Sequence, residues 1–184
     1  QPFRGNLAKV LIYDAALSPT QILQNYYGGP IVTDGLIRAL DFSNLVCYEP
    51  EDVGGVELTG RDTYNVNNSP TYLSDFGGGI LCDETDEFIN LNDVCATDFV
   101  TVELWYTRAA AGNGEDIVFN KESTWEVRDD GGNLRWALMA NNQGWFWHST
   151  GATIAVGETA QIVLSYDGNR VKFYKNGKLI QTYN

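Results

Sequence analysis

The sequence is poor in the residues from which most catalytic and metal sites are built. Its 184 residues include one histidine, one methionine, three cysteines and five prolines. A single histidine excludes a multi-histidine metal site, and the absence of a C-x-x-C pair excludes thioredoxin-type and common zinc motifs. No run of about 18 apolar residues occurs, so we expect no transmembrane helix.

Positive charge is also scarce, because 12 basic residues stand against 24 acidic ones and give a net charge of −12. Such a field repels a phosphate backbone and an anionic lipid surface, so we expect neither nucleic-acid binding nor membrane insertion. Hydrophobic residues make up 43% of the chain, which is enough for a core, and 12% are aromatic. This profile suits an all-β domain.

The three cysteines are Cys47, Cys82 and Cys95. We interpret them as buried thiols, with a single disulfide in an oxidising compartment as the alternative. Sequence alone does not choose the pair.

One short helix is predicted near the start of the chain. Ser18 is a good N-cap, Pro19 suits the first helical position, and Gln21 completes a capping box. The glycines and proline at 28–30 end the helix, which we expect over residues 19–26.

Elsewhere the pattern is that of short strands separated by turns. Residues 100–106 alternate strongly, and Asp-Gly-Asn at 167–169 predicts a hairpin between 161–166 and 170–174. The sequence therefore predicts an all-β antiparallel β-sandwich, a jelly roll, with one short N-terminal helix. We expect a strand–helix segment over residues 1–27 and a sandwich body over residues 28–184.

Three stretches carry a family resemblance: VTVELWY at 100–106, the hairpin over 162–178, and GNLAKVLIYD with the following helix over 5–26. Together they resemble the laminin G-like jelly roll of the concanavalin A-like lectin/glucanase superfold. In that family the third stretch closes the domain, whereas here it opens the chain. The resemblance therefore implies the same fold in a permuted order, of the kind found in phage virion and extracellular structural proteins.

Three accounts fit the permuted order. In the first, the chain is a circular permutant whose own first strand fills the gap and whose ends lie together. In the second, the first strand and helix insert into a neighbouring subunit and build a head-to-tail filament. In the third, the chain is one period of a tandem array. We expect the second, a structural subunit of an extracellular or virion filament that binds copies of itself. The predicted subunit contacts are Val10, Ile12, Tyr13, Leu17, Ile22, Leu23 and Tyr26.

An alternative function is glycan binding by a lectin-like adhesion module. Residues 144–149 are predicted to form a strand, whose alternation places Trp145 and Trp147 on one face, where exposed rings stack on sugars. The competing interpretation is that one set of tryptophans lies in the core and the other covers the edge of the sandwich. The predicted glycan-binding residues are Trp136, Asn141, Asn142, Trp145, Trp147 and His148.

Two other kinds of site involve carboxylates: a glucanase active site and a Ca²⁺ site. Glucanases of this superfold carry alternating carboxylates on one strand, but Glu103 stands alone among apolar residues, so we expect no hydrolase. An acidic run is the candidate Ca²⁺ site, with a solvated acidic turn as the alternative that its spacing favours. Its carboxylates are Asp83, Glu84, Asp86 and Glu87.

Overall fold

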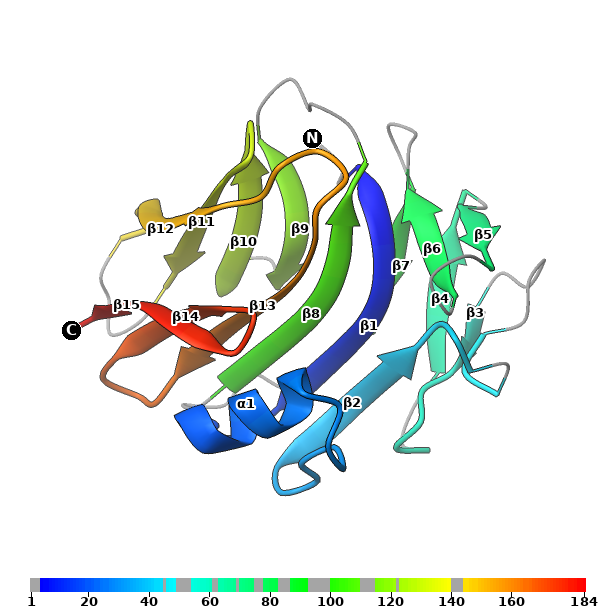
Figure 1. Ribbon diagram of the computed structural model, residues 1–184, viewed down its shortest axis with the longest axis horizontal. Helices are drawn as coiled ribbons and strands as arrows, with labels where there is room; N and C mark the ends of the chain where they lie inside the picture. Colours follow the sequence, from blue (N-terminus) through cyan, green and yellow to red (C-terminus); the bar gives the residue numbers. More distant parts are fainter. Residues whose placement is uncertain are drawn as a thin grey trace.

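The computed structural model describes residues 4–44, 46–48, 54–60, 63–68, 70–74, 78–82, 87–92, 100–109, 115–121, 123–139 and 144–184. Among these residues no helix is long and apolar enough to cross a membrane. The elements are β1 (Gly5–Tyr13), α1 (Pro19–Tyr26), β2 (Leu36–Asp41), β3 (Gly54–Val56), β4 (Thr63–Asn67), β5 (Thr71–Leu73), β6 (Gly79–Cys82), β7 (Phe88–Asn90), β8 (Val100–Arg108), β9 (Asp116–Lys121), β10 (Trp125–Asp130), β11 (Asn133–Leu138), β12 (His148–Thr153), β13 (Thr159–Tyr166), β14 (Val171–Lys175) and β15 (Lys178–Tyr183) (Figure 1).

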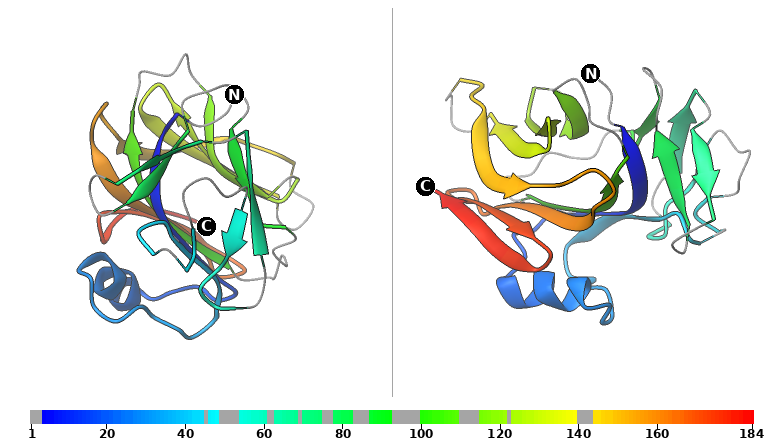
Figure 2. Two further views of the ribbon diagram at one scale, coloured as in Figure 1. Left: turned by 90° about the vertical axis from the view of Figure 1, so that its right-hand side faces the viewer. Right: turned by 45° about the horizontal axis from the view of Figure 1, so that its top comes forward.

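The strands form three antiparallel sheets. The largest runs β15-β14-β13-β8-β1-β6-β5, with β2 paired to β1 beside β6. A four-stranded sheet runs β12-β11-β10-β9, and a three-stranded sheet runs β3-β4-β7. The right-hand view of Figure 2 shows the four-stranded sheet above β8 and β13 of the large sheet, and the three-stranded sheet at the other end of the molecule, beside β5 and β6. The predicted all-β sandwich with one short N-terminal helix is thereby confirmed.

One hydrophobic core joins all three sheets. Leu104 of β8 and Phe173 of β14 face inward from the large sheet, Val127 of β10 comes from the four-stranded sheet, and Tyr64 of β4 comes from the three-stranded sheet. Each of these side chains is at most 2% exposed. Residues 100–106 alternate as expected, so the even-numbered members of β8 fill the core and the odd-numbered ones face outward.

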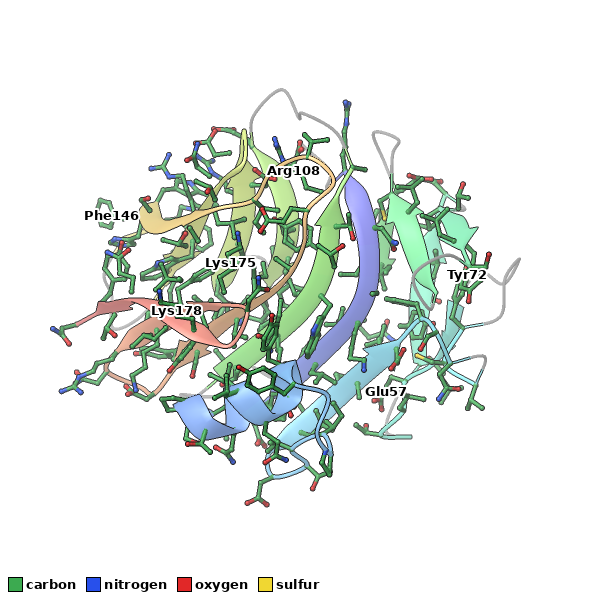
Figure 3. All side chains as sticks on the ribbon, in the orientation of Figure 1. Glu57, Tyr72, Arg108, Phe146, Lys175 and Lys178 are labelled. Atoms are coloured by element: carbon green, nitrogen blue, oxygen red, sulfur yellow. The ribbon has the colours of Figure 1, made fainter. Side chains whose placement is uncertain are left out.

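A buried ion pair ties the large sheet to the four-stranded sheet. Arg108, at the end of β8, donates from Nε to Oδ2 of Asp129 on β10 at 2.7 Å, and both side chains are nearly inaccessible. Figure 3 shows Arg108 at the upper end of β8. Asp116 lies opposite Asp129 in the register of β9 and β10. Burial, and next the charge of Asp129, raise the pKa of Asp116.

The helix forms where its capping signals place it, over Pro19–Tyr26. The Gln21 amide donates to the Ser18 hydroxyl at 3.3 Å, and the Ser18 amide donates to the Gln21 side chain at 2.9 Å. Eight residues are too few for an independently stable helix, so α1 depends on packing against the large sheet. Ile22, with no exposed surface, is its apolar anchor.

The start of β12 differs from the prediction, whereas the burial of two cysteines agrees with it. The strand expected over residues 144–149 begins only at His148, because β12 pairs with β11 from that point onward and Gly144–Trp147 lie outside any strand. Cys47 and Cys82 are buried thiols, as expected, and Cys95 lies outside the described residues.

Candidate functional site: the seat of the first strand and helix

The first strand of the chain is a central strand of the large sheet. On one side β1 pairs with β8 along its whole length, from Gly5 opposite Arg108 to Tyr13 opposite Thr101. On the other side its first half pairs with β6 and its second half with β2. In the sheet order, β1 is therefore the strand that joins β8 to β6 and β2, as Figure 1 shows.

We call the surface that β1 and α1 occupy on the rest of the chain the seat. The predicted contact residues fall on both of its faces. Val10 and Ile12 enter the main core, whereas Tyr13, Leu17 and Ile22 belong to a second cluster on the outer face, under α1. All five are at most 3% exposed. Leu23 and Tyr26 are more accessible than the five, but both lie against Gly177 in the β14–β15 turn. In the structure all of these contacts are made within one chain.

Each outward side chain in the middle of β8 contacts the strand–helix segment. The Thr101 hydroxyl accepts a hydrogen bond from the Leu17 amide at 3.0 Å and lies 2.7 Å from the Ala15 carbonyl, to which it donates. Trp105 lies under the Lys9 ammonium, 5.6 Å from the ring centroid. Glu103, between them, is the polar centre of the seat.

Glu103 has no exposed surface and is held by two side-chain amides. Asn25 of α1 donates to one carboxylate oxygen at 2.8 Å, and Gln161 of β13 donates to the other. The Asn25 amide group also donates to the Tyr13 hydroxyl at 3.0 Å. A single carboxylate thus connects β8 to β1, α1 and β13.

The backbone fixes the orientation of both amides. The Val32 N–H donates to the Asn25 side-chain oxygen at 3.0 Å, and the Gly177 N–H donates to that of Gln161 at 2.8 Å. Each amide must therefore present its NH₂ group to Glu103. Only a side chain with two acceptor oxygens satisfies both donors, which explains a carboxyl at this position rather than an amide.

Burial governs the acidity of Glu103. Desolvation raises its pKa from 4.5 to about 7, and it outweighs the opposing effects of the Asn25 and Gln161 hydrogen bonds and of the Lys9 charge. Burial, reinforced by the Glu103 charge, also raises the pKa of Tyr13. The seat therefore contains a carboxyl that titrates near neutrality.

The predicted glycan-binding residues do not form one surface. Trp136 is 4% exposed, stacks on His148 with ring centroids 4.5 Å apart, and belongs to the core, so no sugar can reach its face. Trp145 and Trp147 are half-buried, with ring centroids 5.9 Å apart. Asn141 and Asn142 lie outside the described residues. Between the two tryptophans Phe146 is 64% exposed, and Figure 3 shows it pointing away from the body.

Of the four residues predicted to bind Ca²⁺, Glu87 is the one that the structure describes, and it is buried. Asp83, Glu84 and Asp86 lie outside the described residues. Among the residues that the structure does describe, no group of three or more histidine, cysteine or acidic side chains is arranged to hold a metal ion.

Sequence reasoning missed the amides that complete the seat. Asn25 is 3% exposed and Gln161 is 1% exposed, yet both are polar and fall outside any hydrophobic pattern. The available signal was Glu103 itself, because a lone carboxyl in an alternating apolar strand needs buried hydrogen-bond donors.

The fold agrees with a comparison against known families. Residues 83–184, more than half of the chain, match a laminin G profile described as the concanavalin A-like lectin/glucanases superfamily. The match spans β7 to β15 and leaves β1 and α1 outside it. No curated protein and no solved structure matches the chain. The chain belongs to the concanavalin A-like lectin/glucanases superfamily.

Proposed function

We propose that the protein is a structural subunit of an extracellular or virion filament, which assembles by exchanging its first strand and helix between copies. The observation that carries this proposal is the position of β1. A strand from the start of the chain occupies the centre of the large sheet and joins its two halves. A strand and helix with so large a buried contact form a natural unit of exchange.

The exchanged unit extends slightly beyond the helix. Ile31 and Val32 pack in the cluster under α1, and the Val32 N–H binds Asn25, so residues 5–32 form one unit that we call the leading segment. Thr33 and Asp34 are exposed and Gly35 has a positive φ of 71°. Extending residues 33–35 displaces the segment by about 10 Å, and such short hinges favour exchange.

Packing beside the hinge is incomplete. A pocket of about 380 Å³ lies between β1, β2 and the loop after α1, and its lining includes Leu11, Ile31, Leu36 and Leu58. Apolar side chains that line an open pocket are only partly removed from water, so releasing the segment on this side exposes less additional apolar surface.

The ends of the ordered strands also bear on the three accounts of the permuted order. β15 lies four strand positions from β1, or roughly 19 Å at the usual spacing of strands. Figures 1 and 2 show the start of β1 and the end of β15 at separate edges of the molecule. The permutation account predicted that the chain's own first strand fills the gap, as β1 does in the structure, and that the chain ends lie together, which the start of β1 and the end of β15 do not.

The proposal is tested by an engineered disulfide that records which chain supplies β1. Lys9 and Trp105 are register partners on the outer face, so Lys9→Cys together with Trp105→Cys places two thiols across the β1–β8 boundary. We expect oxidation of the assembled protein to give covalent dimers and a ladder of larger species on a non-reducing gel. Light scattering before oxidation should show masses above the 20.4 kDa of one chain.

Each single-cysteine variant serves as the control for the native thiols. Neither should form the ladder, because Cys47 and Cys82 are buried and Cys95 is replaced by serine in all of these variants. A disulfide that forms only within single chains at every protein concentration, with a monomeric mass, would contradict the exchange.

A second candidate function is glycan binding, and it is favoured by the aromatic segment before β12. Phe146 is largely exposed beside the half-buried Trp145, and sugar faces stack on such rings. Trp145→Ala and Phe146→Ala should then abolish binding on a glycan array without lowering the melting temperature. Trp147 is a poorer target, since Arg128 stacks on it at 3.9 Å and its loss removes packing as well.

Tyr27 provides the control for this experiment. It is an exposed aromatic residue at the end of α1, 76% accessible, and Tyr27→Ala should leave glycan binding intact. Equal glycan binding by all of these variants would contradict the hypothesis that this segment binds glycans.

A further inference from the structure

Most contacts between the leading segment and its seat are not selective. Backbone pairing along β1 accepts almost any strand, and the apolar positions tolerate hydrophobic residues of similar size. Lys9 contacts the Trp105 ring and Asp41, but these contacts are partly exposed. The fully buried polar contact is that of Asn25 with Glu103, where a carboxylate with no exposed surface meets one side chain of the incoming segment.

The chemistry of position 25 leaves little freedom. The side chain there accepts a hydrogen bond from the Val32 N–H and donates to both Glu103 and the Tyr13 hydroxyl. An apolar residue leaves a buried donor and a carboxylate oxygen unsatisfied, and an aspartate sets a second negative charge against Glu103. An asparagine amide meets all three requirements.

We propose that Glu103 is the specificity-determining residue of segment exchange: it admits a leading segment that carries asparagine at position 25 and rejects segments that do not. The partner that this selects is a second copy of the same chain. The inference rests on the proposed exchange, but its chemistry can be tested separately within one chain.

Reversing the polarity of the contact gives the test. In the variant Asn25→Asp with Glu103→Gln, the aspartate accepts from Val32 N–H, and the new amide donates to it. The oxygen of the new amide accepts from Gln161, whose orientation is fixed by Gly177. The Tyr13 hydroxyl, which accepts from Asn25 in the wild type, now donates to the aspartate. Each of these contacts therefore keeps a donor and an acceptor, and the single negative charge has moved from β8 to α1.

Thermal unfolding at pH 8 of the wild-type chain and its variants tests recognition within one chain. N25D should melt roughly 6–12 °C below wild type, because two buried carboxylates face each other. The N25D/E103Q double variant should regain at least half of that loss. Thr20→Asp adds the same charge at an exposed position on α1 and should melt with wild type.

Mixing tests recognition between chains. N25D and E103Q chains, labelled with a donor and an acceptor fluorophore, are unfolded together and refolded. Exchange pairs the altered segment with the altered seat and the native segment with the native seat, so we expect at least twofold more energy transfer than in a donor- and acceptor-labelled N25D sample alone.

The outcomes separate the inference from the proposed function. If the double variant melts no higher than N25D, Glu103 does not discriminate at position 25, whatever the state of assembly. If the double variant recovers but the mixture shows no energy transfer, the exchange is disproved, and with it the selection of a second chain as partner.

Discussion

Replacing Arg108 with alanine should lower the free energy of unfolding by about 3–5 kcal/mol, the range found when one partner of a buried ion pair is removed. Asp129 would stay buried without its cation, in register with a second carboxyl at Asp116. The variant would also lose a buried ion pair that joins the large sheet to the four-stranded sheet. Urea unfolding followed by tryptophan fluorescence measures the change.

The control is an exposed ion pair of similar type. Lys172 lies 3.9 Å from Asp167, and both side chains are about one third exposed. Lys172→Ala should therefore change the free energy of unfolding by less than about 1 kcal/mol. Equal losses in the free energy of unfolding for the two variants would show that the buried pair stabilises the fold no more than the exposed pair.

The stability that Glu103 contributes should fall as the pH rises. Its pKa is about 7 in the folded chain against 4.5 in the unfolded chain, so between these values the folded state binds the additional proton. The contribution is complete below pH 4.5 and is lost as the pH passes through 7. A difference of 2.5 pKa units amounts to about 3 kcal/mol.

The measurement compares wild type with Glu103→Gln by urea unfolding from pH 4.5 to pH 8. The variant lacks the titrating group, so the free energy of wild type relative to the variant should decline by about 3 kcal/mol over this range. A difference that stays flat with pH would refute the assignment.

Glu158 offers a control with the opposite sign. The Lys175 ammonium and the Ala155 amide hold its pKa below the usual value. Its contribution is therefore present above the ordinary pKa and is lost in acid. The free energy of wild type relative to Glu158→Gln should accordingly rise with pH, where that relative to Glu103→Gln declines.

Local signals in the sequence predicted the elements well. The capping box at Ser18 and Gln21 marked the helix, and the turn at 167–169 marked the hairpin of β13 and β14, because both depend on residues close in the chain. The strand expected at 144–149 was wrong by four residues at its start. Its aromatic alternation resembles a strand, but pairing with β11 decides where β12 begins.

The candidate site was predictable only in part. The apolar positions of β1 and α1 followed from periodicity, and five of the seven are buried. Trp136 belonged to the core rather than the surface, since sequence does not tell which aromatic face meets the opposite sheet. The contact of Asn25 with Glu103 joins residues from distant parts of the chain and depends on the fold itself.

The position of β1 has a consequence for the timing of synthesis. Arg108, the partner of Gly5, emerges from the ribosome roughly a hundred residues after it, or about 5–20 s later at usual elongation rates. During that interval β2 and β6 of the same chain can pair with the first strand, but its partner β8 has not yet been made. Neighbouring nascent chains on one messenger are the nearest source of an empty seat, so the local density of ribosomes influences which chain each first strand completes.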